Sequence, residues 1–282
     1  MQTSRKRNAK TGKHGSSKHG KKKTVSHNPF RRIPSYLLWT LLSVIVVVYI
    51  FFFYRTFVGP YSFRWKALYG DVTYPDGKIR GIDISHYQGD IDWEKLRNAD
   101  IQGSPVSFVF IKATEGKDML DENFNQNFFN AHKNGILRGA YHFFSTKSSG
   151  KEQADFFCKM VQLDEGDLPP VLDVEVIGGL TPVRLRTEVL DWMRIVEKRY
   201  SVKPILYTSY KFKTLYLNTP DFDSYPYWIA HYYVNSLQYE GEWKFWQHTD
   251  VGHVDGIRHY VDVNIFNGTY EDLMDMTIEP DL

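Results

Sequence analysis

The chain has 282 residues, 42% of them hydrophobic and 16% aromatic, which is enough to bury the core of one or two domains. Its formal charge of +2 conceals an asymmetry, because eleven of the 35 basic residues lie within residues 1–32, which contain no acid, leaving 24 basic against 33 acidic residues elsewhere. Cys158 is the single cysteine and excludes an intrachain disulfide.

Residues 1–32 are polar and basic, a composition that predicts a disordered tail. The next 22 residues, Ile33 to Tyr54, carry no charge and are long enough to cross a hydrocarbon core of about 30 Å as a helix. A secretory signal peptide is the alternative, but this apolar run is longer and ends in bulky FFFYRTF without a small-residue cleavage site. We therefore predict an uncleaved transmembrane signal anchor over residues 33–55.

The positive-inside rule places the basic tail in the cytoplasm and everything after about Val58 in the periplasm or at the cell exterior. Anionic lipids of the inner leaflet would hold such a tail, so no nucleic-acid partner is expected. Residues 56–79 read as a linker, with Gly59, Pro60, Pro75 and Gly77. The remaining domain is predicted to span residues 80–275.

This domain alternates strand and helix patterns, which predicts parallel strands joined by helical crossovers. Eight strands in sequence favour a closed α/β barrel, irregular near its end where helix signals are weak; an open doubly wound sheet is the main alternative. The predicted helices cover 121–134, 149–163 and 182–200. The predicted strands cover 81–85, 106–113, 137–144, 169–175, 203–209, 225–232, 242–249 and 259–266.

The segment LPPVLDVEV, residues 168–176, places two carboxylates at the end of an apolar strand. Asp173 and Glu175 are two apart and therefore share a face of the strand. Each carboxylate raises the proton affinity of the other, an arrangement suited to acid-catalysed cleavage of a glycosidic bond. Two surface acids on a strand that has reached solvent are the alternative.

Further polar and aromatic residues lie at the predicted strand ends, which form the active face of a barrel. Aromatic rings beside acids are typical of sugar sites. Residues such as Tyr141, Tyr207 and Trp228 are more often core packing than ligand contacts. For His142 and His231 a hydrogen-bonded core histidine is the alternative. The candidates at strand ends are Asp83, Tyr141, His142, Asp173, Glu175, Tyr207, Trp228, His231, Gln247 and Asp262.

Other residues have structural interpretations. Cys158 lies in a predicted helix and is expected to be a buried structural thiol, Asp92 a helix N-cap, and Lys112 with Glu115 an ion pair. No G-x-G-x-x-G opens a helix after a strand, and neither a P-loop nor H-E-x-x-H occurs, which argues against nucleotide chemistry and a zinc site. We expect no cofactor and no metal.

The segments GIDISHYQGDIDW, FVFIKATEG, GAYHFF, PPVLDVE, YPYWIAHY, WQHTDVG and VDVNIF, in this order, resemble glycoside hydrolase family 25, the Chalaropsis-type lysozymes or N-acetylmuramidases. The resemblance covers roughly residues 80–270. It implies an irregular TIM-like (β/α)5β3 barrel and hydrolysis of the β-1,4 bond between N-acetylmuramic acid and N-acetylglucosamine in bacterial peptidoglycan. The membrane anchor departs from many secreted relatives.

By motif, Asp83, Asp173, Glu175 and Asp262 match the acidic active-site positions of the family. We expect Glu175 to act as the general acid. Cα atoms two apart on a strand are separated by about 6.6 Å, which leaves retaining, inverting and substrate-assisted routes open. We slightly favour the last, in which Asp173 orients the 2-acetamido group of the substrate.

The substrate-binding candidates are Tyr141, His142, Tyr207, Trp228 and Gln247. The expected partners are peptidoglycan strands and, through residues 33–55, the membrane; the catalytic domain is expected to be monomeric. An inactive membrane-tethered glycan-binding barrel and a chitinase-like glycosidase are the alternative functions.

Overall fold

The computed structural model describes residues 34–58, 74–232, 234, 236–237, 239 and 241–279. The predicted basic tail and most of the predicted linker lie outside these residues. The chain forms two compact units, Met1–Thr56 and Phe57–Leu282.

The first unit contains one long helix, α1 (Ser35–Phe53), which continues as the π-helical turn η1 (Tyr54–Val58). The helical segment Ser35–Thr56 has a mean hydropathy of 2.5 and buries none of its residues against protein. At 1.5 Å per residue, such a segment extends about 33 Å. The segment is therefore long and apolar enough to cross a membrane. A signal sequence near the N-terminus would have the same length and composition.

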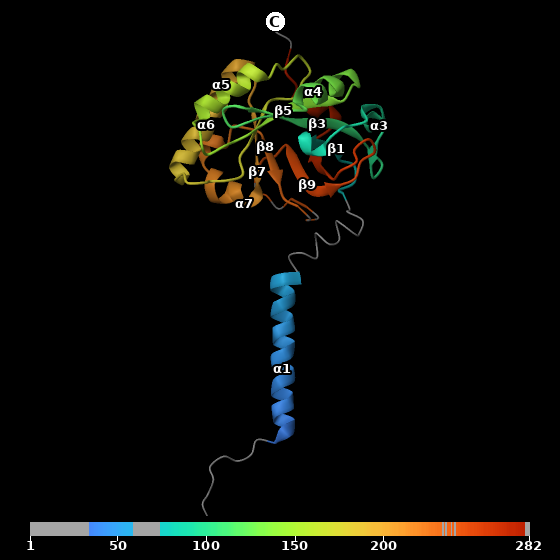
Figure 1. The fold of residues 1–282 in the computed structure, drawn as a ribbon, viewed down its shortest axis with the longest axis vertical. Helices are drawn as coiled ribbons and strands as arrows, with labels where there is room; N and C mark the ends of the chain where they lie inside the picture. The colour runs from blue at the N-terminus through green and yellow to red at the C-terminus, as the bar shows by residue number, and fades with distance from the viewer. Residues whose placement is uncertain are drawn as a thin grey trace, which may run out of the picture. The chain divides into compact units, whose positions relative to one another are not determined.

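The second unit is a closed barrel of eight strands (Figure 1). Closure comes from β1, which pairs with β3 on one side and with β10 on the other, so the doubly wound alternative is wrong. β2 and β4 pair only with β3 and lie outside the ring. The ring strands are β1 (Ile79–Ile84), β3 (Ser104–Glu115), β5 (Leu137–Phe143), β6 (Val171–Asp173), β7 (Ile205–Ser209), β8 (Tyr227–Ala230), β9 (Phe245–Gly252) and β10 (Val261–Phe266), with β2 at Asp100–Ile101 and β4 at Met119–Leu120.

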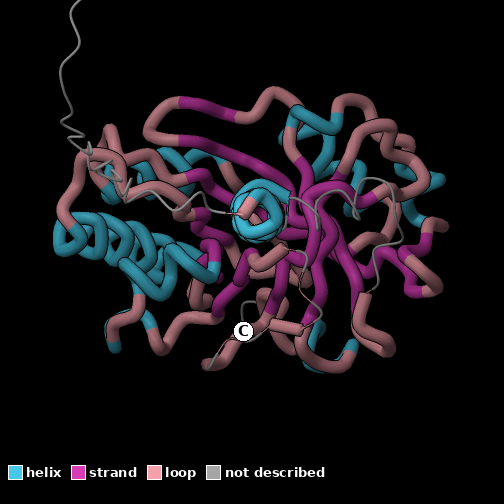
Figure 2. The backbone as a smooth tube through the Cα atoms, turned by 90° about the horizontal axis from the view of Figure 1, so that it is seen from below, coloured by secondary structure: helices cyan, strands magenta, loops and turns pink. Residues whose placement is uncertain are grey.

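The helices of the second unit lie around the outside of its ring of strands (Figure 2). The predicted helices are confirmed as α4 (Phe124–Lys133), α5 (Gly150–Met160) and α6 (Pro182–Tyr200). Ser149 caps α5 in a reciprocal capping box with Glu152, and Asp92 caps the short helix after β1, as predicted. The shorter helical segments are η2 (His86–Gln88), α3 (Trp93–Arg97), α7 (Tyr210–Phe212), η3 (Lys213–Leu217), η4 (Pro220–Phe222) and α8 (Tyr270–Met274).

β10 is the irregular element of the ring, since it runs antiparallel to both of its neighbours. The other neighbouring pairs in the ring are parallel. The start of β10 therefore lies beside the carboxyl ends of the parallel strands. This reversal places Asp262 directly opposite Asp83 in the β1–β10 register.

Alternation along the strands separates two apolar cores. On β3, Val109 and Ile111 pack in the core beneath the helices, whereas Phe108 and Phe110 belong to the core inside the barrel. Phe110 stacks on Trp228 with ring centroids 4.6 Å apart. These rings fill the barrel toward the amino ends of its parallel strands and leave the carboxyl ends to polar side chains.

Two glycines make room for the aromatic rings. A Cβ on Gly81 would lie 2.5 Å from the Phe108 ring, and one on Gly139 would lie 2.6 Å from the Phe110 ring. No side chain fits at either distance without displacement of the neighbour. Gly81 and Gly139 are therefore the positions at which β1 and β5 approach the aromatic core.

Candidate active site

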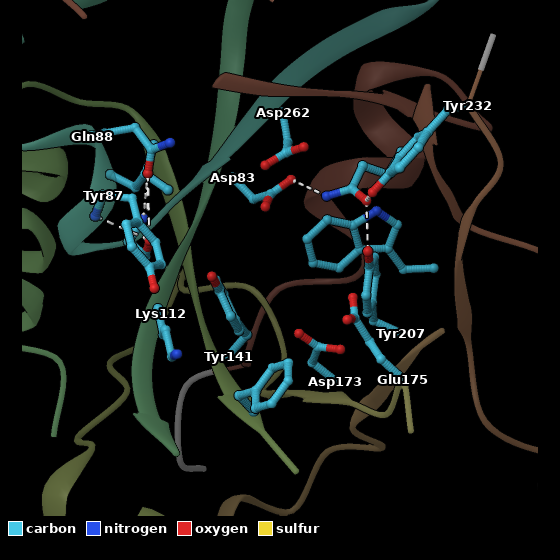
Figure 3. Close-up of a pocket in the computed structure, with 15 residues that line it drawn as sticks. Asp83, Tyr87, Gln88, Lys112, Tyr141, Asp173, Glu175, Tyr207, Tyr232 and Asp262 are labelled. Atoms are coloured by element: carbon cyan, nitrogen blue, oxygen red, sulfur yellow. Dashed lines mark hydrogen bonds between the residues drawn. The ribbon is translucent and has the colours of Figure 1, made fainter. Parts of the chain in front are cut away.

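The inward-facing residues at the carboxyl ends of the parallel strands line a cavity of about 240 Å³ (Figure 3). It is bounded by residues from every ring strand, together with the segments after β1, β6 and β8. The lining residues are Asp83, Ile84, Ser85, Tyr87, Gln88, Lys112, Tyr141, Phe143, Asp173, Glu175, Tyr207, Trp228, Tyr232, Gln247 and Asp262. Asp173 at the end of β6 and Glu175 just after it thus both line this cavity.

Four carboxylates converge on this cavity. Asp173 and Glu175 lie side by side at the end of β6, across from Asp83 and Asp262 of the β1–β10 pair (Figure 3). Asp83 and Asp173 are each only 7% exposed, whereas Glu175 is exposed at the cavity mouth. Residues far apart in the sequence therefore form one acidic cluster.

Burial raises the proton affinity of this cluster. The pKa of Asp173 is raised well above its usual range, first by burial and then by the negative charges of Glu175 and Asp83. One of its oxygens, Oδ1, is buried without a hydrogen-bond partner among the described residues. An ionised Asp173 would be an unsatisfied buried charge, so its neutral form is favoured.

The pKa of Glu175 is also raised, mainly because protein surrounds its carboxyl group even though the residue opens onto the cavity. The polar hydroxyl of Tyr207 nearby and the positive charge of Lys112 partly offset this rise in pKa. Glu175 is therefore the carboxyl group that combines a raised proton affinity with access to the cavity. Both properties are required of a general acid.

Asp83 and Asp262 differ in their hydrogen bonding. Burial raises the pKa of Asp83 to about 6, against the lowering effect of hydrogen bonds from Asn264 and Gln247. Burial and the charges of Asp83, Asp250 and Glu175 raise the pKa of Asp262 to about 9. Burial and like charge therefore favour the protonated form of Asp262, whereas the two amide donors favour the ionised form of Asp83.

The sequence model of Glycosyl hydrolases family 25 matches residues 82–257, which include most of the barrel. The chain belongs to this family. It is 41% identical over 232 residues to the uncharacterized protein YegX of Escherichia coli strain K12, covering 82% of each chain. It is 36% identical over 207 residues to Lysozyme M1 of Streptomyces globisporus, covering 68% of each.

The structure of a family 25 glycosyl hydrolase from Bacillus anthracis matches this fold with a TM-score of 0.66 and 35% identity, covering 73% of this chain and 96% of that chain. The family resemblance inferred from the motifs is thus confirmed, and the protein is a glycoside hydrolase.

Four of the five predicted substrate-binding residues line the cavity: Tyr141, Tyr207, Trp228 and Gln247. His142 does not line the cavity, so its prediction as a substrate contact is wrong. It is 0% exposed, and its ring nitrogens lie 2.7 Å from Thr114 Oγ1 and 3.1 Å from Gln153 Oε1. Because successive residues of a strand face opposite sides, His142 points away from the barrel interior when Tyr141 points into it.

Lys112 is a cavity residue that the sequence interpretation assigned only to an ion pair. The pair exists, with Lys112 Nζ 2.7 Å from Glu115 Oε2, and the lysine also lines the family 25 cavity. It follows Phe108 and Phe110 on the inward face of β3, and this period of two could have revealed it. Tyr87 is 74% exposed at the cavity rim, and no comparable sequence pattern predicts it as a site residue.

Cys158 is half-buried in α5, where it packs against the core beneath the helices. Burial raises the pKa of its thiol to about 11. A thiol with so high a pKa is largely unionised at neutral pH and is a poor nucleophile. Its predicted structural role is therefore consistent with its surroundings, although it is less buried than expected.

Proposed function

We propose that this family 25 barrel hydrolyses the β-1,4 bond between N-acetylmuramic acid and N-acetylglucosamine in peptidoglycan. The observation that carries the proposal is the convergence of four carboxylates, from β1, β6, β10 and the segment after β6, on one cavity lined with tyrosine and tryptophan. Lysozyme M1, similar over most of the barrel's length, is named for this type of activity.

In the proposed mechanism, Glu175 donates a proton to the glycosidic oxygen as the bond from that oxygen to the anomeric carbon breaks. Its raised pKa keeps the carboxyl group protonated into the range where free glutamate is ionised. The new ionised Glu175 then takes a proton from the water that attacks the anomeric carbon. One water is consumed, and Glu175 returns to its protonated form.

Asp173 is assigned to the 2-acetamido group of the muramic acid residue. A buried carboxyl group with a free oxygen beside the general acid is positioned to hydrogen-bond that amide, whose oxygen would attack the anomeric carbon. This substrate-assisted route requires the acetyl group. Removal of the acetyl groups from the glycan should therefore abolish turnover, and an unchanged rate on such glycan would refute the route.

The central test compares Glu175→Gln with Glu165→Gln in the full chain, solubilised in detergent, on purified peptidoglycan. Glu165 is an exposed residue in the segment before β6, at the opposite end of that strand from the cavity. Loss of the general acid should reduce turnover by about 10²–10⁴-fold, while the control keeps the parent rate. Equal rates for both variants would refute the assignment.

The identity of the cleaved bond is a separate measurement. After borohydride reduction of the products, mass spectrometry should find muramic acid at the new reducing ends. N-acetylglucosamine at those ends would instead indicate the chitinase-like alternative. Binding of the glycan without any cleavage by the parent protein would indicate an inactive glycan-binding barrel.

We further propose that α1 anchors the protein in the cytoplasmic membrane with the barrel outside. The apolar segment Ser35–Thr56 and the eleven basic residues that precede it support this topology. A periplasmic reporter enzyme fused after Leu282 should be active and a cytoplasmic fluorescent reporter dark, with both in the membrane fraction. The opposite pattern would refute the orientation.

A further inference from the structure

Two amide side chains donate hydrogen bonds to the same oxygen of Asp83. Gln247 Nε2 on β9 and Asn264 Nδ2 on β10 each lie 2.8 Å from Asp83 Oδ2. Both amides are buried, with Gln247 3% and Asn264 0% exposed. Buried amides that meet on one carboxylate oxygen form a binding site for a negative charge. We name Gln247 and Asn264 the amide clamp.

The orientation of both amides is fixed by further donors. Gln247 Oε1 accepts hydrogen bonds from the hydroxyls of Tyr207 and Tyr232, each at 2.6 Å (Figure 3). Asn264 Oδ1 accepts one from Trp228 Nε1 at 2.8 Å. An indole N–H can only donate, so the oxygen of Asn264 must face Trp228 and its nitrogen must face Asp83.

The pair of amide donors distinguishes Asp83 from the other charged and titratable groups of the cavity. Among the described residues of the cavity lining, Lys112 is the one lysine or arginine, and its ammonium is paired with Glu115. Within the part of the chain that the structure describes, none of the other three cavity carboxylates accepts a comparable pair of amide hydrogen bonds, and Asp173 Oδ1 is buried there without a partner. The groups facing Asp83 are Asp262 on β10, Asp173 and Glu175 at the end of β6, Tyr141 on β5, Tyr207 on β7, Lys112 on β3 and Tyr232 after β8.

We propose that Gln247 and Asn264 are positioning residues that keep Asp83 as the anionic carboxylate of the site while its buried neighbours retain protons. Amide N–H groups stabilise the ionised form and gain little from a protonated acid, since they cannot accept its proton. The hydrogen bonds from Gln247 and Asn264 act to lower the pKa of Asp83, whereas burial raises it.

A fixed anion serves the proposed reaction because positive charge develops at the anomeric carbon in the transition state. The role differs from the substrate contact predicted for Gln247 from the sequence, since both polar atoms of its amide are engaged by protein groups. The proposal rests on the proposed function only for its kinetic consequences. The ionisation of Asp83 can be measured without substrate.

The test is a pair of variants, Gln247→Met and Asn264→Leu, which keep the approximate shape and remove the donors. In the full chain in detergent, labelled with ¹³C at the aspartate carboxyl groups, the Asp83 resonance is identified by its absence in Asp83→Asn. We expect its titration midpoint to rise by about one pH unit in each variant, because a hydrogen bond to a charged group contributes at least that much. The acidic limb of kcat/KM on peptidoglycan should move upward by the same amount.

Tyr227→Phe is the matched control. It removes a buried hydroxyl from the residue next to Trp228 on β8, where it bonds Leu217 O at 3.4 Å outside the cavity. The Asp83 titration and the pH profile should stay at the parent positions. If a clamp variant does not fold, Tyr232→Phe at the cavity edge should give a smaller shift in the same direction, and no shift would refute the proposal.

Two other outcomes would also overturn it. A uniform loss of kcat/KM at every pH with an unchanged Asp83 titration would assign the clamp a purely structural role. A raised KM with an unchanged titration would assign Gln247 to the substrate. Absence of peptidoglycan cleavage by the parent would refute the proposed function alone, since the carboxyl titration needs no substrate.

Discussion

Asp262→Asn should stabilise the folded barrel, by an amount that depends on pH. Asp262 carries a pKa raised to about 9 in the folded protein, against about 3.9 for an unfolded chain. Because the pKa is higher in the folded protein than in the unfolded chain, the stability that this carboxyl group contributes is fully present below about pH 4. That stability is lost as the pH rises toward 9. Folding at intermediate pH must therefore bind a proton to this carboxyl group.

The cost of binding that proton follows from the distance between the pH and the unfolded pKa. It is about 1.4 kcal/mol for each pH unit, hence about 1.5 kcal/mol at pH 5 and about 4 kcal/mol at pH 7. Asparagine has the shape of the protonated acid and binds no proton. The variant should thus gain up to about 3 kcal/mol more at pH 7 than at pH 5, an upper limit because the side chain is partly exposed and interacts with Asp83.

Urea unfolding of the full chain in detergent at the two pH values measures this difference, with the exposed Asp255→Asn as control. The control should change stability by less than about 0.5 kcal/mol at both pH values. A gain for Asp262→Asn that is equal at pH 5 and pH 7 would refute the reasoning, since it would show that Asp262 is ionised in the folded protein.

Three further predictions concern the pH dependence of activity and the fold. Activity should fall as pH rises through the raised pKa of Glu175, and a pH–rate profile whose alkaline limb persists unchanged in Glu175→Gln would contradict this. Arg138→Met should destabilise the barrel by about 3–5 kcal/mol in urea unfolding, because it strands the buried Asp167 that Arg138 binds at 2.6 and 3.0 Å; a loss below about 1 kcal/mol would show that the pair is dispensable. Gly139→Ala places a Cβ 2.6 Å from the Phe110 ring and should cost about 1–3 kcal/mol by overpacking, and a melting temperature equal to the parent's would show that the ring can move.

The strands and the acidic residues on them were predictable because both are local signals. Apolar runs located each ring strand within a few residues, and the D-x-E spacing placed Asp173 and Glu175 on one face. The count of eight predicted strands favoured closure of the sheet into a ring. That Asp83 and Asp262 face one another depends on the antiparallel register of β10, which no local pattern encodes.

The hydrogen bonds that the acidic residues accept were not predictable either, because they join residues that are distant in the sequence. Asn264 was part of a recognised motif, VDVN, but its bond to Asp83 joins residues 181 apart in the sequence. His142 shows the limit of predicting site residues from strand ends. Its neighbour Tyr141 faces the opposite side of the strand, yet both were predicted to bind substrate. Side-chain direction had to come from the structure.

The pairing of β1 with β10 has a consequence for how the enzyme is made. The acidic cluster is shared between the first and the last strand of the ring, so it does not exist until the end of the chain has returned to its beginning. A chain still emerging from the ribosome or being threaded across a membrane carries Asp83 and Glu175 but no assembled cavity. The cavity that would hold the glycan can therefore assemble only after the whole barrel has been synthesised.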